Sequence, residues 1–206
     1  MPARERLPRS FFQRDPCAVA RALLGQRLVR RSGGRRVSGI IVETEAYLGI
    51  ADKAAHTYGG RRTRRNAAMW GEGGHAYVYF IYGMHYCVNV VAGGAGEPVA
   101  VLIRALEPDE GLETMRQRRP RARRDTDLCS GPAKLCQALG ITRGHDGADL
   151  VAGSTLFLER LRARTLPLRK IGNGPRIGVA YAEEWQHRPL RYWIVGNPHV
   201  SADSRR

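Results

Sequence analysis

The chain has 206 residues, with 34 Lys and Arg against 19 Asp and Glu and a formal net charge of +15. This length suits one domain around a single hydrophobic core, and the charge favours a polyanionic partner such as nucleic acid. No apolar stretch reaches the roughly 18 residues of a membrane span or has the form of a signal peptide. We therefore exclude membrane-embedded classes and expect an intracellular protein, in the cytoplasm or nucleoid of a bacterium or in a eukaryotic nucleus.

The N-terminal part of the chain predicts an arm, a helix and a hairpin. Residues 1–10 are polar and charged and predict a mobile arm. The dipeptide Asp15-Pro16, followed by apolar residues at helical spacing, predicts a helix that ends at Gly25. Residues 27–30 and 37–45 are rich in Val and Ile and flank a glycine turn, so they predict a β-hairpin.

The rest of the chain alternates loops, strands and helices. Residues 51–74 predict a basic loop with a weak helical signal at 67–70. Residues 75–91 and 98–103 predict two strands joined by a glycine-rich turn. We expect helices at 107–118 and 131–139 around a charged mobile loop at 118–127, and final strands at 156–159, 176–180 and 190–195.

No repeat or linker divides this pattern. We expect a single α+β domain over residues 11–200, with a curved, mostly antiparallel β-sheet flanked by helices, and a tail at 201–206. The four cysteines have no C-x-x-C spacing and no His cluster beside them, so we expect free thiols, no metal and no cofactor.

A basic loop and an aromatic strand are neighbours in sequence. Between residues 46 and 96 there are two acids, against Lys53 and four arginines at positions 61 to 65, and the tyrosines follow directly. Proteins that bind unpaired bases combine a cationic track with aromatic stacking faces. Tyr77 and Tyr79 share one face of the strand, and Tyr82 before Gly83 can project as a wedge between base steps. Ordinary sheet aromatics are the alternative, because sheets favour these residues.

Carboxylates in an apolar strand are the second candidate feature. Glu43 and Glu45 share one face of the strand predicted at 37–45, and Glu45 lies at its end. Structural salt bridging explains either residue, whereas glycosidic hydrolysis would use one carboxylate to deprotonate water and stabilise a cationic sugar. Arg104 ends the apolar run 99–103 and is either a surface charge or the partner of that general base. The residues alone leave both alternatives open.

Several long motifs then occur in order along the chain. They are Ile-Val-Glu-Thr-Glu-Ala-Tyr-Leu-Gly at 41–49, Ala-Ala-His at 54–56, Gly-Gly-Arg at 59–61, Arg-Asn at 65–66, Tyr-Val-Tyr-Phe-Ile-Tyr-Gly-Met at 77–84, Leu-Ile-Arg-Ala-Leu-Glu-Pro at 102–108 and Leu-Cys-Ser-Gly-Pro-Ala-Lys-Leu at 128–135. Together they resemble the alkyladenine (3-methyladenine) DNA glycosylase family. The resemblance extends from residue 11 to 200.

The resemblance implies a catalytic role for Glu45 as the residue that activates the hydrolytic water. Arg104 and a backbone carbonyl near Ile177 would complete the cradle of that water. Glu43 would then be structural. The residues implied to contact the flipped base are Tyr47, Ala54, His56, Tyr79 and Asn89. Tyr47 would stack on one face of the base and His56 and Tyr79 on the other, while Asn89 would crowd the 2-amino group of guanine.

The resemblance also implies which residues meet the DNA. Tyr82, with Met84 beside it, would intercalate, and Arg61, Thr63 and Arg65 would bind phosphates. His85 stands at a position where we expect an aromatic residue in some relatives. The implied partner is double-stranded DNA that contains damaged purines, bound by a monomer.

Two other functions compete with a monofunctional glycosylase that flips alkylated or deaminated purines. A bifunctional enzyme would form a Schiff base, for which Pro2 after removal of Met1 is the conceivable amine. The alternative outside enzymes is a basic nucleic-acid-binding protein whose aromatic residues only stack. Trapping with borohydride separates the first alternative, and loss of base release in a Glu45 variant separates the second.

Overall fold

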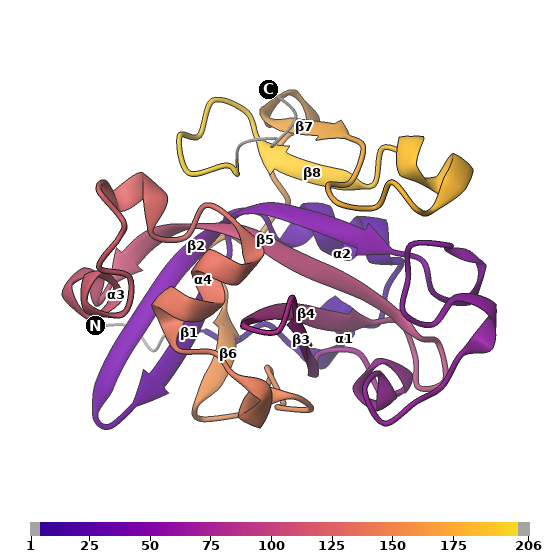
Figure 1. The fold of residues 1–206 in the computed structure, drawn as a ribbon, viewed down its shortest axis with the longest axis horizontal. Coiled ribbons are helices and arrows are strands. Elements are labelled where there is room, and N and C mark those ends of the chain that lie inside the picture. The colour runs from indigo at the N-terminus through magenta and orange to yellow at the C-terminus, as the bar shows by residue number, and fades with distance from the viewer. Residues whose placement is uncertain (1–4, 202–206) are drawn as a thin grey trace.

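A computed structural model describes residues 5–201 of the chain (Figure 1). Residues 1–4 and 202–206 lie outside the described residues. Pro2, the first four residues of the expected arm and all but the first residue of the expected tail are among them.

The described chain folds around one curled antiparallel sheet. The sheet has the strand order β3-β4-β5-β2-β1-β6, and β8 pairs with β2 and with β7. This arrangement confirms the predicted α+β class with a curved antiparallel sheet. The strands are β1 (Arg27–Ser32), β2 (Arg35–Tyr47), β3 (Ala76–Ile81), β4 (His85–Ala92), β5 (Val99–Glu110), β6 (Leu156–Glu159), β7 (Ile171–Gly174) and β8 (Arg191–Ile194).

Four α-helices pack beside the sheet, as Figure 1 shows: α1 (Arg9–Phe12), α2 (Pro16–Leu23), α3 (Leu112–Arg118) and α4 (Pro132–Leu139). Asp15 caps α2 by accepting a hydrogen bond from the Ala18 amide at 2.9 Å, and Pro16 occupies the first turn. Helix α4 begins with Pro132 and ends at Gly140, whose φ of 69° is the left-handed conformation that glycine tolerates. Single 3₁₀ turns form at Gly49–Ala51, Tyr58–Gly60, Ala67–Trp70, Asp125–Asp127, Arg143–His145, Leu168–Lys170 and Glu183–His187.

Three predicted elements were wrong in their bounds. Residues 75–91 form the hairpin β3–β4, because the chain turns at Tyr82-Gly83, where both residues have positive φ. Residues 107–110 continue β5 by pairing with β2, and the helix starts only after Gly111, whose φ is 75°. Residues 176–180 are not a strand, and β7 lies just before them instead.

Residues 5–10, expected to be part of a mobile arm, pack on the domain. Leu7 is 1% exposed, and Arg6 forms an isolated bridge with Glu159. Arg9 donates to Asp149 at 2.7 Å. These contacts attach the segment through both apolar burial and an ion pair.

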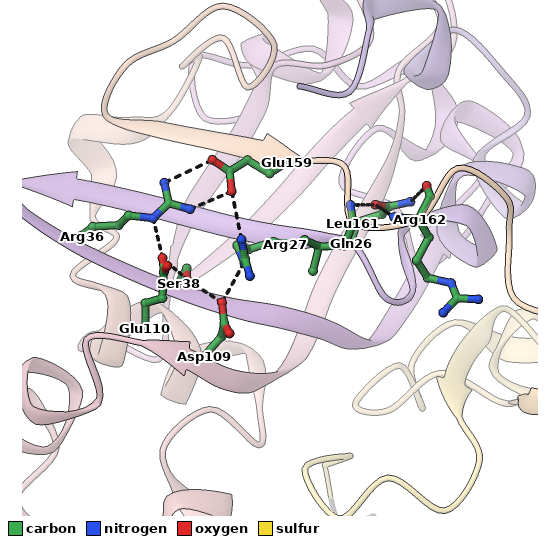
Figure 2. A network of polar contacts seen from close by, with 9 residues as sticks. All are labelled: Gln26, Arg27, Arg36, Ser38, Asp109, Glu110, Glu159, Leu161 and Arg162. Carbon is green, nitrogen blue, oxygen red and sulfur yellow. Dashed lines mark hydrogen bonds and ion pairs between the residues drawn. The ribbon is translucent and has the colours of Figure 1, made fainter. Parts of the chain in front are cut away.

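A charged network covers one face of the β1–β2 hairpin (Figure 2). Glu159 lies 2.7 Å from Arg36 and 3.3 Å from Arg27, and Arg27 also contacts Asp109 at 2.7 Å. Arg36 bonds Glu110 as well. On this face, arginines from β1 and β2 are therefore neutralised by carboxylates from β5 and β6.

Candidate active site

A cavity of about 740 Å³ opens where the C-terminal end of β2 meets the β3–β4 hairpin. Its walls come from β2, β3, β4, β5, the start of α4 and the segment 176–181. Among the lining residues are seven that the sequence singled out for the base or its chemistry: Tyr47, Ala54, His56, Tyr79, Asn89, Arg104 and Ile177.

Glu45 lies next to this cavity with its side chain completely buried. Its Oε1 accepts the Ile177 amide at 2.8 Å and contacts Nη1 of Arg104 at 3.1 Å. Its Oε2 accepts the Tyr47 hydroxyl at 2.9 Å. A carboxylate has about four acceptor positions, so these three donors orient the group and leave a position on Oε2 for one more donor.

Arg104 joins the two neighbouring carboxylates of β2. Its Nε lies 3.3 Å from Glu43 and its Nη1 3.1 Å from Glu45. Burial alone would lower the pKa of Arg104, but the two carboxylates raise it above its ordinary value, so the guanidinium stays charged. Ala105 and Ile103 pair with Glu43 and Thr44, and Arg104 is the extra residue between them. Such a bulge redirects a side chain, and here it places the charge between two acids.

Glu43 makes contacts that keep it away from the cavity. It accepts from Arg191 at 3.1 Å and from the Ser201 amide at 2.8 Å, in addition to its contact with Arg104. It therefore ties β8 and the last described residue to β2. This geometry fits the structural role that the resemblance implied for it.

The sequence analysis missed a buried ion pair between Asp52 and Arg176. Both residues have side chains with no exposed surface, and two guanidinium nitrogens lie 2.6 and 2.8 Å from the carboxylate. Arg176 also donates to the Ala46 carbonyl at 3.0 Å, and its guanidinium carbon lies 4.7 Å from the centre of the Tyr47 ring. The pair fixes the segment that carries the Ile177 amide, and the only sequence signal was an isolated acid just beyond a strand.

Aromatic side chains form one wall of the cavity. The rings of His56 and Tyr79 meet edge to face at 4.6 Å, and Nδ1 of His56 lies 2.8 Å from the Tyr77 hydroxyl. Burial, with smaller contributions from Arg65 and Arg61, lowers the pKa of His56 to about 4. Burial raises the pKa of Tyr47 and of Tyr79 well above the ordinary value. Near neutral pH the wall is therefore uncharged, and Tyr77 is a part of it that the resemblance did not assign.

Asn89 and Ala54 both line the cavity. Asn89 is 4% exposed, sits opposite Tyr77 in the β3–β4 pair, and donates to the Tyr77 carbonyl at 3.1 Å. The Ala54 amide donates to Asp52 at 3.0 Å. Both residues are therefore held in place by hydrogen bonds that involve a backbone atom.

The turn between β3 and β4 carries the two residues expected to intercalate. Tyr82 has a φ of 53° and its side chain is 82% exposed, and Met84 is 70% exposed. A tyrosine in the left-handed region is uncommon, because its Cβ crowds the backbone. Tyr82 also lines the cavity mouth, while His85 lies behind the turn and pairs with Ile81.

The basic loop lines a smaller cavity of about 310 Å³ that shares His56 with the larger one. Arg61, Thr63 and Arg65 all line it. Arg65 donates to the Phe80 carbonyl at 3.1 Å, so this arginine is held against β3. The loop itself is shaped by a residue without an assigned role, Asn66, whose amide donates to the carbonyls of residues 56 and 61 at 2.9 Å.

Within the described residues, no group of three or more His, Cys, Asp or Glu side chains could hold a metal ion, and the four cysteines are free. None of the helices in residues 5–201 has the length and apolarity to cross a membrane.

Comparison with known proteins assigns the chain to a family. A family model described as methylpurine-DNA glycosylase matches residues 10–198. DNA-3-methyladenine glycosylases of Mus musculus and Homo sapiens are each 47% identical over 209 residues, which is 97% of this chain. The chain spans 62% of the mouse protein and 69% of the human one. A putative 3-methyladenine DNA glycosylase of Bacillus cereus (strain AH187) is 49% identical over 94% of this chain and 98% of its own length.

The class defined by these matches is that of hydrolases acting on N-glycosyl bonds in DNA. Within that class, the chain belongs to the methylpurine-DNA glycosylase family. The resemblance predicted from the motifs is thereby confirmed.

Proposed function

We propose that this protein is a monofunctional DNA glycosylase that flips alkylated or deaminated purines out of duplex DNA and hydrolyses their N-glycosyl bond. The observation that carries the proposal is Glu45, a buried carboxylate held by three donors beside a cavity with uncharged aromatic walls. We propose that it acts as a monomer in DNA repair.

In the proposed chemistry, Glu45 accepts a proton from a water molecule as the water oxygen attacks C1′ of the sugar. The C1′–N bond breaks as the new C1′–O bond forms, and the electron pair of the broken bond leaves with the base. The products are an abasic site and the free base. The Ile177 amide and Arg104 hold the carboxylate at the correct angle, and its negative charge stabilises the cationic sugar as the bond breaks.

The aromatic wall would select the flipped base. Tyr47 on one side and His56 with Tyr79 on the other would stack on a purine, a contact worth about 1 to 3 kcal/mol per base. Because the pKa of His56 is about 4, its ring is neutral near pH 7 and does not repel a cationic alkylated purine. Asn89 would crowd the 2-amino group of an undamaged guanine.

Flipping and DNA binding would depend on the exposed residues around the cavity mouth. Tyr82, with Met84, would fill the space that the base leaves, at a cost that is smaller for a weakly paired lesion. Arg61, Thr63 and Arg65 would contact phosphates and fix the position of the duplex without reading its sequence.

A single-turnover assay on duplexes that contain 3-methyladenine, 7-methylguanine, hypoxanthine or ethenoadenine tests this proposal. We expect release of at least one of these bases, and no covalent adduct when borohydride is added during the reaction. A trapped adduct would contradict the monofunctional mechanism, and failure to release any of the four bases would contradict the activity. In Tyr82→Ser, an unchanged fluorescence signal from 2-aminopurine placed next to the lesion would remove the wedge role.

A further inference from the structure

The arginines on the two faces of the β1–β2 hairpin have different surroundings. In an antiparallel pair, directly opposed residues point to the same face, and the face alternates along each strand. Arg31 opposes Arg36, on the face where Glu159 and Glu110 neutralise the guanidinium groups (Figure 2). Arg30 opposes Val37, on the other face of the same hairpin.

Arg30 and Arg35 are diagonal neighbours on this second face, because Arg30 opposes Val37 and Arg35 opposes Ser32. Arg118 lies on α3, which packs against β2. We call these three residues the hairpin basic surface. No carboxylate of the described chain contacts any of them. Arg30 donates to the Thr155 carbonyl at 3.4 Å and Arg118 to the Ala138 carbonyl at 3.1 Å, both neutral acceptors. Nε of Arg30 is buried without a partner. Within residues 5–201, the three guanidinium groups are therefore not neutralised by a carboxylate, and Arg35 is exposed to solvent.

The electrostatics of the three residues agree with this arrangement. Burial, and then the charge of Arg118, lowers the pKa of Arg30. Burial, and then the charge of Arg35, lowers the pKa of Arg118. The guanidinium groups are thus near enough to repel one another, and an external anion would relieve that repulsion.

The hairpin basic surface is connected to the cavity by α4. Pro132 and Ala133 at the start of α4 line the cavity, and Arg118 lies against Gly140 at its end. Figure 1 shows α4 between α3 and the β3–β4 hairpin. Since α4 has 8 residues, it spans about 12 Å. Arg35 is farther away, at the opposite end of β2 from Tyr47, and 12 residue steps of a strand extend over at most about 40 Å.

We infer that the hairpin basic surface binds the phosphodiester backbone of duplex DNA beyond the damaged base pair. The inference rests on the proposed function for the presence of a duplex at the cavity. Guanidinium groups suit this partner because each can donate to two phosphate oxygens. The occupant we infer is the flank of the damaged duplex, because one duplex seated at the cavity would bring those phosphates with it.

Duplex length distinguishes a contact beyond the lesion from one at the lesion. Base pairs rise by 3.4 Å, so a duplex of about 12 base pairs extends roughly 20 Å to each side of a central lesion and one of about 30 extends roughly 50 Å. Arg35 is exposed and makes no contact that a substitution would break, so Arg35→Glu should fold normally. Arg164→Glu is the matched control, because Arg164 is also exposed and lies far along the chain from the hairpin.

The measurement is fluorescence anisotropy with duplexes that contain a tetrahydrofuran abasic analogue. For Arg35→Glu we expect Kd to rise about tenfold for the long duplex and to stay within about twofold for the short one, since repulsion replaces attraction at a phosphate contact. Arg164→Glu should change both by less than about twofold. In Arg35→Gln, the slope of log K against log salt should fall by about one on the long duplex.

A second arm identifies the source of the phosphates. If the wild-type protein, saturated with the short duplex, captures a labelled undamaged duplex and Arg35→Glu does not, the surface binds a second duplex and the inference is overturned. If only the length effect appears, it binds the flank. Equal weakening of both lengths, or no difference between Arg35→Glu and Arg164→Glu in either arm, would overturn the inference. Base release from the short duplex reports separately on the proposed function, because Arg35 has no part in it.

Discussion

Glu45 and Glu159 are both carboxylates with almost no exposed surface, and each contacts arginine side chains. Glu159 is held by Arg36 and Arg27, and its surroundings are other charged groups of the network in Figure 2. Glu45 has a single arginine, and its other donors are a backbone amide and a tyrosine hydroxyl at the wall of a cavity.

Burial and contact with an arginine therefore do not by themselves identify a reactive carboxylate. All three donors to Glu159 are arginine nitrogens, and these ion pairs join β6 to β1 and β2. The three donors to Glu45 are a backbone amide, a hydroxyl and one guanidinium, and all three belong to residues that line the cavity. Substitutions at and around the two residues can separate a structural role from a catalytic one.

The largest effect is expected for Glu45→Gln. The amide keeps the shape of the side chain but cannot accept a proton from water, so single-turnover base release should fall by about 10² to 10⁴-fold. Binding of the damaged duplex, measured by anisotropy, should be retained. Release near the wild-type rate would remove Glu45 from the proposed chemistry.

Glu159→Gln should show the opposite pattern. Removing the acid that Arg36 and Arg27 share leaves each arginine with one remaining carboxylate, Glu110 for Arg36 and Asp109 for Arg27, and we expect the free energy of unfolding to fall by about 2 kcal/mol. Urea denaturation measures this loss. Base release by the folded variant should match the wild type, and a loss of release as large as that in Glu45→Gln would break the comparison.

A smaller effect on catalysis is expected for Asp52→Asn, which acts on Glu45 through Arg176. Without the charged partner, Arg176 should hold the Ile177 amide less well, and a displacement of the catalytic group by about 1 Å can cost up to about 100-fold in rate. We expect release to slow by about 10 to 100-fold while KM changes little. Arg176→Lys keeps the charge, so it should slow base release less than Asp52→Asn does. If the pair were purely structural, these variants would change only the unfolding midpoint and not the rate of release.

The smallest effect is expected in the pH dependence of stability. The pKa of His56 falls from 6.5 to about 4 on folding, so the unfolded chain takes up the proton first as the pH drops. Above about pH 6.5 the histidine is neutral in both states and does not lower the free energy of unfolding. Stability is lost as the pH falls from about 6.5 toward about 4. His56→Gln should reduce the change of the urea midpoint with pH between pH 6.5 and 5. If the slope of midpoint against pH were unchanged, His56 would be excluded as the source of that pH dependence.

Glu159 does not interfere in that pH window. Burial alone would raise the pKa of Glu159, but hydrogen bonds from Arg36 and Arg27 hold it below the ordinary value. Its contribution to stability is therefore complete above that value and is lost only at more acidic pH. The same titration in Glu159→Gln is a direct control.

Much of the local structure could be predicted from short sequence signals. The cap at Asp15-Pro16, the end of α4 at Gly140 and the glycine turn before Arg35 depend on neighbouring residues and form as expected. Predictions failed where long-range pairing overrode local preference. Residues 107–110 favour a helix locally, but they extend β5 because β2 offers hydrogen-bonding partners there.

By itself, the sequence determined which residue types stand at the end of β2 and in the β3–β4 turn. The ordered motifs, rather than composition, singled out Glu45 over Glu43. Only the tertiary structure decided the contacts that orient these residues. The Arg104 bulge depends on the register of two strands, and Asp52 meets Arg176 across 124 positions of sequence. Such contacts leave no local pattern, because they are set by how the elements pack and not by the preferences of neighbouring residues.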